Sequence, residues 1–411
     1  MFFRQAHADY HLIRTMLVFA LYMMFTPSIS LAGKTELSPA AQIGKILFFD
    51  TSLSGSGKMA CSTCHDPNFA YGPPNSLAVQ LGGKKLDLPG TRAVPSLRYK
   101  DNTPPYADLM DNPDGISAPG PGGGFTWDGR AATLADQAGI PLLASNEMAN
   151  KSKKDVVNTI RLSSYSELFR KTFGNDIFNS TDIAFEKASY ALQAFQLEDP
   201  SFHPYSSKYD LYSSNKIGGD LTDAEKRGMF VFNNPKKGNC FSCHYNGAGL
   251  NGSVALFTDF SYSAIGVPRN TKDIPSNRNL KADHAHYDLG ICDRSDHPMP
   301  ENAQYCGMFK TPTLRNVATR QVFFHNGQIK SLREAILFYN TRDTNPERWY
   351  PTVNGVVQKF DDLPLQYREN IDKQMPLDGR AAGSVPPLTD QEVDDLIAFL
   401  NTLTDDYKPQ K

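Results

Sequence analysis

The pentapeptide Cys-x-x-Cys-His occurs twice in this chain of 411 residues, at 61–65 and at 240–244. Two thiols three positions apart can form thioethers with the vinyl groups of one porphyrin, and the histidine that follows can supply the proximal nitrogen to its iron. A zinc site or a redox dithiol is the alternative for a single motif. Two copies favour two covalently bound c-type haems. The expected attachment and iron-binding residues are Cys61, Cys64, His65, Cys240, Cys243 and His244.

A weak internal repeat leads into the two motifs. Segments 37–48 and 221–232 carry Leu, Ser or Thr, Ala, Gly and Phe at the same offsets. Each segment starts with a residue that caps helix N-termini, Ser38 or Thr222, and then places apolar residues at helical spacing. A helix, a short loop and a haem motif form the start of a small all-helical cytochrome c domain. The repeat therefore predicts a duplicated domain.

The rest of the chain favours an all-α fold with long irregular loops. Residues 66–126 are rich in Gly and Pro, which predicts a long loop rather than a helix. Helical patterns dominate from 131 to 195, and 198–219 has the composition of a linker. A capping box, Thr389-Asp-Gln-Glu392, opens a final amphipathic helix. We expect two cytochrome c-like domains, residues 33–205 with the first haem and residues 206–411 with the second.

The N-terminal residues 1–32 have the pattern of a signal peptide. Arg4 and Arg14 precede an apolar stretch at 16–25, and Ser30-Leu31-Ala32 is a small-x-small cleavage pattern. The apolar stretch falls short of the roughly 20 residues that cross a bilayer, although an uncleaved anchor is the alternative. We expect cleavage after Ala32, export to the periplasm and no stable membrane insertion afterwards.

Two cysteines, Cys292 and Cys306, lie outside the haem motifs. Because disulfides persist in oxidising compartments, these two are expected to pair in an exported protein rather than to remain unpaired thiols. The formal net charge of the chain is −2 and it has no long basic run, which argues against a nucleic-acid-binding protein.

Motifs beyond the haem sites add a family resemblance. They are Trp127-Asp128-Gly129-Arg130, Gln137, Pro141, Asn146-Glu147-Met148, the segment 309–317 and Phe324-His325-Asn326-Gly327. Over nearly the whole mature chain they resemble the bacterial di-haem cytochrome c peroxidases and their MauG subgroup. The resemblance implies an oxidoreductase that reacts with hydrogen peroxide at the first, peroxidatic haem. Oxidising equivalents would then pass through the second haem to a small redox protein or a protein substrate. The alternatives are a conventional cytochrome c peroxidase that removes peroxide and a non-enzymatic periplasmic electron carrier.

The resemblance also implies different iron ligands at the two haems. In ordinary members a Met binds the second haem fourteen residues after the His of a His-Asp/Asn-Gly motif, and counting from His325 gives Tyr339. A Tyr here is similar to the MauG subgroup and would favour oxidised iron through its anionic oxygen. The alternative is a packed aromatic on an amphipathic helix. No His lies between His65 and Trp127, so the first iron is expected to be five-coordinate and open to peroxide.

Three further residues take roles from the same resemblance. Glu147 would be the acid/base that moves a proton between the two oxygens of peroxide, and its alternative is a surface helix residue. Gln137, with Pro141 and Met148, would shape or hydrogen-bond the distal pocket. Trp127 would relay charge between the haems, or pack as a core aromatic, or both.

Several positions depart from the family pattern. Leu142 stands where MauG has a methionine, and Gly238 stands where MauG has the tryptophan that passes oxidising equivalents to its protein substrate. Trp349 is either a substitute exit or a structural residue. The family binds one calcium ion between its domains. Its Asn ligand is missing from Arg92-Ala93-Val94-Pro95, and its two carbonyl ligands fall at Arg320 and Val322, which weakens the expectation of calcium.

Overall fold

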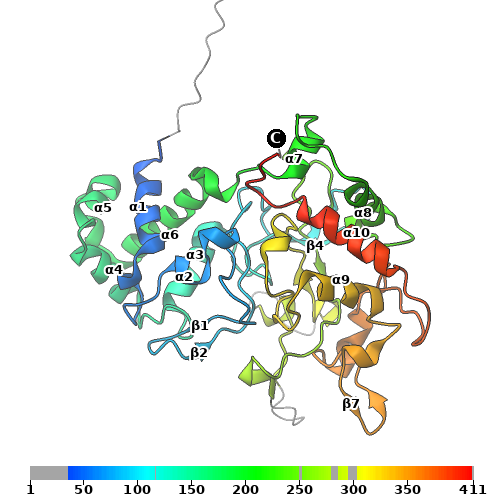
Figure 1. Ribbon diagram of the computed structural model, residues 1–411. Helices are drawn as coiled ribbons and strands as arrows, with labels where there is room; N and C mark the ends of the chain where they lie inside the picture. Colours follow the sequence, from blue (N-terminus) through cyan, green and yellow to red (C-terminus); the bar gives the residue numbers. More distant parts are fainter. Residues whose placement is uncertain (1–35, 116, 250–251, 279–285, 295–302, 410–411) are drawn as a thin grey trace, which may run out of the picture. The chain divides into compact units, whose positions relative to one another are not determined.

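Two pairs of packed helices carry the fold, one pair beside each Cys-x-x-Cys-His motif (Figure 1). In the computed structural model, which describes residues 36–115, 117–249, 252–278, 286–294 and 303–409, helix α1 (Pro39–Phe49) packs on α6 (Thr181–Glu198). Helix α8 (Asp223–Asn233) packs in the same way on α10 (Asp390–Asn401). Helices α1 and α8 are the two copies of the repeat, so the repeat corresponds to a shared structural unit.

A glycine in each repeat allows these helices to cross closely. A Cβ atom on Gly44 of α1 would lie 1.8 Å from the carbonyl oxygen of Ala191 in α6. A Cβ atom on Gly228 of α8 would lie 1.9 Å from the carbonyl oxygen of Asp395 in α10. Since no side chain fits at either crossing, the shared glycine of the repeat is a packing requirement.

Each helix pair belongs to its own hydrophobic core. The first core joins side chains from residues 43–202, among them Phe48 and Phe195. The second joins side chains from residues 209–403, among them Phe232 and Phe399. Both cores lie within one unit, Leu37–Lys411. The division into domains at residues 205 and 206 stays a prediction.

Shorter elements complete the two halves. The other helices are α2 (Cys61–Cys64), α3 (Leu134–Leu143), α4 (Lys153–Leu162), α5 (Ser166–Phe173), α7 (Lys208–Ser213) and α9 (Leu332–Thr341). The strands form four antiparallel two-stranded ladders: β1 (Leu81–Gly82) with β2 (Leu88–Pro89), β3 (Ala107–Met110) with β4 (Gly120–Gly122), β5 (Tyr262–Ser263) with β6 (Phe309–Lys310), and β7 (Thr352–Val353) with β8 (Val356–Val357).

Most of the expected local features are present. Ser38, Thr222 and Thr389 cap their helices through side-chain oxygens, and Thr389 forms the expected capping box with Glu392. Cys292 and Cys306 are joined in a disulfide with a Cα–Cα distance of 5.1 Å, which confirms that prediction. Helices dominate, as expected for an all-α chain, but the short ladders were not predicted. The expected linker contains α7, because Ser207 and Asp210 form a capping box there.

Residues 1–32, the predicted signal peptide, lie outside the described residues. Within the described ranges no helix has the length and apolar character needed to cross a membrane.

Helix α3 is fixed at its start by a capping box that bears on the functional site. Thr133 accepts a hydrogen bond from Asp136 N at 3.0 Å, and Asp136 accepts one from Thr133 N at 3.0 Å. Thr133→Ala is expected to lower the free energy of unfolding by about 1 kcal/mol, because a helix N–H loses its acceptor. Denaturant titration of the holoprotein measures this. Thr133→Ser keeps the oxygen and is expected to unfold at the wild-type midpoint; equal losses in the two variants would contradict the capping argument.

Candidate active site

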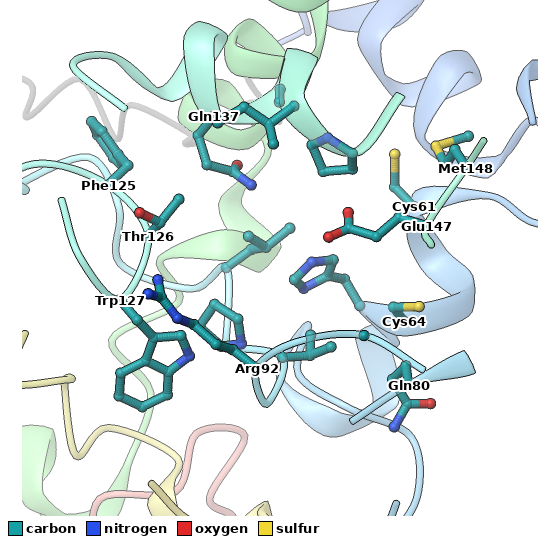
Figure 2. A pocket seen from close by; sticks show the side chains of 18 of the residues that line it. Cys61, Cys64, Gln80, Arg92, Phe125, Thr126, Trp127, Gln137, Glu147 and Met148 are labelled. Atoms are coloured by element: carbon teal, nitrogen blue, oxygen red, sulfur yellow. The ribbon is translucent and has the colours of Figure 1, made fainter. Parts of the chain in front are cut away.

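A cavity of about 210 Å³, here called the first cavity, brings together the residues assigned to the first haem. Cys61 and Cys64 line it from α2, and His65 lines it from the C-cap of this helix. Glu147, Gln137 and Trp127 line it from elsewhere in the chain (Figure 2). The fold therefore collects residues that are up to 86 positions apart in the sequence into one place.

Glu147 projects its carboxylate into the first cavity (Figure 2). No hydrogen bond or ion pair of this carboxylate is present within the described parts of the chain. Burial raises the pKa of Glu147, and the Arg130 guanidinium opposes the rise. Its backbone is held by β1, because a Cβ atom on Gly82 would lie 2.8 Å from the Glu147 Cα atom. A fixed backbone and a free carboxyl group suit proton transfer.

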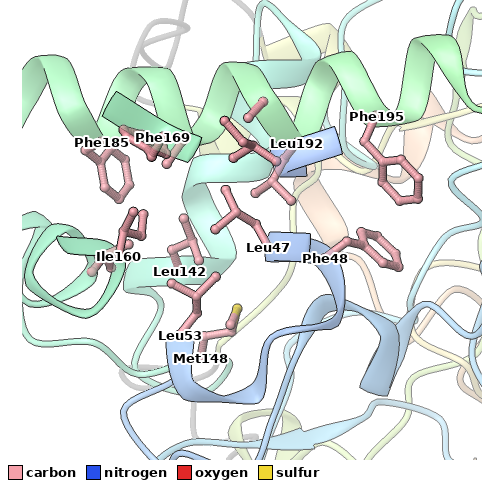
Figure 3. Close-up of a cluster of buried hydrophobic side chains, with 14 of the residues drawn as sticks. Leu47, Phe48, Leu53, Leu142, Met148, Ile160, Phe169, Phe185, Leu192 and Phe195 are labelled. Atoms are coloured by element: carbon pink, nitrogen blue, oxygen red, sulfur yellow. The ribbon is translucent and has the colours of Figure 1, made fainter. Parts of the chain in front are cut away.

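Gln137 reaches the same cavity from α3 (Figure 2). Pro141 and Met148 also line it, as the resemblance implied. Leu142 and Met148 both pack into the first hydrophobic core (Figure 3). Leu142 is only 1% exposed and does not line the cavity. Its departure from the family pattern therefore changes the packing of the core and not the cavity wall.

Trp127 lines both this cavity and a second one. Its indole Nε1 donates to the Ala93 carbonyl at 2.8 Å, and its own carbonyl accepts from Lys310 N at 2.8 Å. The next residue, Asp128, is buried and receives hydrogen bonds from Arg92 at 2.7 Å and Arg130 at 3.0 Å. The Trp-Asp-Gly-Arg motif thus anchors the indole where the two cavities approach each other.

The second cavity, of about 220 Å³, is lined by Cys240, Cys243, His244 and Tyr339. Leu332, Ala335, Ile336 and Tyr339 all line it from α9. The apolar stripe predicted for an amphipathic helix is therefore the face that α9 turns to the cavity. The centroid of the Tyr339 ring lies 5.7 Å from that of Phe324, and the Tyr339 hydroxyl makes no hydrogen bond to the described residues. Burial raises the pKa of Tyr339.

Both motif histidines are oriented in the same way. His65 Nδ1 lies 3.0 Å from the Tyr71 carbonyl oxygen, and His244 Nδ1 lies 3.1 Å from that of Phe257. A carbonyl at Nδ1 fixes this nitrogen as the donor and leaves Nε2 as the free base. Burial lowers the pKa of each imidazole to about 4, so both are neutral at pH 7. Each ring is therefore prepared to bind a metal through Nε2.

Comparison with known proteins identifies the family of this chain. A family model for di-haem cytochrome c peroxidases matches residues 38–217. The methylamine utilization protein MauG of Paracoccus denitrificans is 34% identical over 382 residues, which cover 90% of this chain and 89% of that protein. The chain belongs to the di-haem cytochrome c peroxidase/MauG family. It is therefore a haem peroxidase-type oxidoreductase.

Proteins named as peroxidases also resemble the chain, in addition to the MauG protein. The crystal structure of the diheme peroxidase BthA from Burkholderia thailandensis matches with a TM-score of 0.79 and 38% identity, covering 90% of this chain and 87% of that one. The cytochrome c551 peroxidase of Nitrosomonas europaea is 27% identical over 303 residues, 73% of this chain and 72% of that protein.

Membership of a di-haem family implies two c-type haems, and the two cavities fit them. They have nearly equal volumes, and each contains one histidine and two thiols of a motif. Burial raises the pKa of all four motif thiols to about 12, so their surroundings favour an uncharged sulfur such as a thioether. The Gln196 Oε1 atom in the first cavity is buried without a hydrogen-bond partner, as expected where a bound group is to be accommodated.

The residues expected at a calcium site do not fit that ion. Ala93 has no side-chain oxygen. The Arg320 guanidinium donates to the Val94 carbonyl through Nη2 at 3.1 Å and to the Val322 carbonyl through Nε at 3.2 Å. A cation of the chain itself thus occupies one of the carbonyls expected as a calcium ligand. No cluster of three or more His, Cys, Asp or Glu side chains suited to a metal is found in the described ranges.

Calcium removal is accordingly expected to have no effect. Incubation of the holoprotein with EGTA should leave the haem absorption spectrum and the melting temperature unchanged, because the Val322 carbonyl already accepts a hydrogen bond from Arg320. A spectral change that is reversed by added Ca²⁺ and not by Mg²⁺ would contradict this expectation.

Some residues of the cavities were not predicted from the sequence. Lys100 and Lys310 line both cavities, and Met375 lines the second. Isolated lysines in irregular segments carry no motif, so no sequence signal identified them. Gly238 lines the second cavity, and a Cβ atom there would lie 2.7 Å from the Val231 carbonyl oxygen, so any larger side chain requires the backbone to shift. Trp349 does not line either cavity; it packs at 5.5 Å on Phe338 and donates to Thr341, which supports its structural role.

Proposed function

We propose that this protein reduces hydrogen peroxide at the first haem and draws the two electrons it needs from another protein through the second haem. The observation that supports this most is the inequality of the cavities. The first contains an unpaired carboxyl group, Glu147, and the second contains a phenol, Tyr339. In the overall reaction H2O2 accepts two electrons and two protons and gives two molecules of water.

The haems, when bound, supply the iron that reduces peroxide and the capacity to store oxidising equivalents. The role of the chain in the first cavity is to move a proton. Glu147 takes the proton from one oxygen of H2O2 and returns it to the other, so that the second oxygen can leave as water. Gln137 orients peroxide by hydrogen bonding from α3.

In the second cavity His244 and Tyr339 would hold the second haem through its iron. An oxygen ligand favours oxidised iron more than a thioether does, which suits a centre that holds an oxidising equivalent. Trp127 lies in the walls of both cavities, and its ring is held by the hydrogen bond to Ala93, so it is placed to carry charge between them.

Two versions of this function differ in which protein supplies the electrons: a protein substrate that is oxidised, or a small redox protein that serves peroxide removal. One relative is a methylamine utilization protein and others are cytochrome c peroxidases. We favour oxidation of a protein substrate over peroxide removal because the residue at the second iron is Tyr339 rather than Met. Steady-state oxidation of a reduced cytochrome c by peroxide at rates typical of enzymes would support peroxide removal instead.

The decisive experiment is the addition of one equivalent of peroxide to the resting ferric protein. We expect an electron paramagnetic resonance spectrum with one high-spin and one low-spin haem before the addition, and a long-lived state oxidised by two equivalents after it. Two low-spin haems that do not react with peroxide would show that the protein is an electron carrier and would overturn the proposal.

We propose further that the protein works in the periplasm after cleavage behind Ala32. The Cys292–Cys306 disulfide supports export, since disulfides persist in oxidising compartments. Mass spectrometry of the protein from a periplasmic fraction should give a mature chain that begins at Gly33 and carries two haems. A chain that retains residues 1–32 would indicate an uncleaved anchor.

A further inference from the structure

Three cationic side chains gather where the two cavities approach each other. Lys100 and Lys310 line both cavities, and Arg320 lines the second. Lys100 and Arg320 are close enough to His65 that both act on its pKa, and Arg320 also lowers the pKa of Lys100. The charge of Lys100 in turn lowers the pKa of Lys310. The three therefore form one cluster, here called the cationic cluster.

Among the described residues the cationic cluster has no anionic partner. Lys100 makes no side-chain hydrogen bond or ion pair to any of them. Within the same part of the chain, Lys310 donates to the Gly124 carbonyl alone, and Arg320 donates to the carbonyls of Val94 and Val322 alone. None of the described carboxylates lies within ion-pair distance of the three. Asp128 acts on the pKa of Lys310, but its carboxylate is already paired with Arg92 and Arg130.

The three side chains are half-buried, and like charges held together without a counter-charge repel one another. Burial lowers the pKa of Lys100 to about 8 and that of Lys310 to about 7. The backbone beside Lys100 is nevertheless anchored by its two preceding residues. Next to Lys100, the buried Arg98 donates to Asp405 at 2.9 Å, and the Tyr99 hydroxyl donates to the same carboxylate at 2.7 Å. An anion supplied from outside the chain would remove the repulsion.

We infer that Lys100, Lys310 and Arg320 form a shared carboxylate-binding site that holds the propionate groups of the two haems. Each haem brings two carboxylates into a cavity that these cations line. Two lysines that face both cavities can neutralise carboxylates from either one. The cluster thereby links the charge of one haem site to that of the other. This inference concerns the cofactor carboxylates and holds whichever protein supplies electrons.

The test is a spectroelectrochemical titration of the full-length holoprotein and its Lys310→Met and Lys100→Met variants. Removal of a positive charge beside the haem carboxylates stabilises the oxidised state, so the reduction potential of at least one haem should shift to lower values in both. Lys310→Arg should restore the wild-type potentials. Lys153→Met is the control. It removes an exposed lysine that is paired with Asp182 and lines neither cavity, so both reduction potentials should stay at their wild-type values.

The thioethers keep both haems attached in every variant, and a pyridine haemochrome assay of two haems per chain verifies it. Wild-type potentials in both Met variants would overturn the inference. If Lys310→Met fails to fold, Lys100→Met decides alone, because Lys100 makes no side-chain hydrogen bond to the described residues. Titration of the wild type with phosphate at constant ionic strength tests the other source of anions. No saturable shift is expected, and a saturable shift would mean that the cluster binds a free anion instead.

Discussion

Replacing Glu147 with glutamine is expected to slow the reaction of the ferric protein with hydrogen peroxide by about 10²–10⁴-fold, the usual contribution of a positioned acid/base. The amide fills the same space but cannot accept the proton from peroxide. Stopped-flow measurement of the second-order rate constant tests this directly. The rate of the wild type should rise as pH rises through the pKa of Glu147, which burial places above its ordinary value, because the ionised carboxylate is the form that accepts a proton.

The controls for this variant separate chemistry from packing. Glu186→Gln makes the same change at an exposed position on α6 and should react at the wild-type rate. The Glu147→Gln protein should also keep its haem content and melting temperature. A wild-type rate and pH dependence in Glu147→Gln would remove Glu147 from the proposed mechanism.

Replacing Tyr339 with methionine is expected to shorten the lifetime of the peroxide-generated oxidised state by roughly 100-fold, which corresponds to about 2.7 kcal/mol. A thioether supports oxidised iron less well than a phenolate does. The measurement is the decay of the oxidised spectrum after one equivalent of peroxide. The second haem should at the same time become easier to reduce. The first-haem reaction with peroxide should keep its rate, since Tyr339 does not line the first cavity.

Tyr350→Phe is the matched control for Tyr339→Met. Tyr350 is a buried tyrosine of the second hydrophobic core, it does not line the second cavity, and its hydroxyl donates to the Gly266 carbonyl at 2.6 Å. Its loss should cost about 1 kcal/mol of stability and leave the oxidised state as long-lived as in the wild type. If both variants shorten the lifetime alike, the effect comes from core packing and not from an iron ligand.

The features that were predictable from the sequence are those that depend on neighbouring residues. The caps at Ser38, Thr222 and Thr389 follow from local hydrogen bonding, and the structure confirms them. The ladders of two to four residues were not predictable, because such short pairs depend on where distant loops meet. The helix α7 was read as part of a linker because six residues give too short a periodic pattern.

The same distinction holds within the active site. The motif residues and Tyr339 could be found by counting along the chain. Their assembly with Trp127 and Glu147 is visible only in three dimensions. Arg320 illustrates the limit most clearly. In the sequence Arg320 is a departure at a calcium position, but its hydrogen bond to Val94, 226 positions away, could not be anticipated from a pattern.

The six cysteines need two different reactions during maturation: one pair forms a disulfide, and the other four must remain thiols until haem is attached. Cys292 and Cys306 must be oxidised to each other. Cys61, Cys64, Cys240 and Cys243 must instead stay reduced until haem vinyl groups reach them. Neighbouring thiols in a Cys-x-x-Cys segment oxidise readily in an environment that makes disulfides. Because we propose that the protein matures in the periplasm, recombinant production needs a host that supplies a thiol reductant together with a haem-attachment apparatus there. Refolding the purified polypeptide in air would allow each Cys-x-x-Cys pair to form a disulfide, which cannot react with a haem vinyl group.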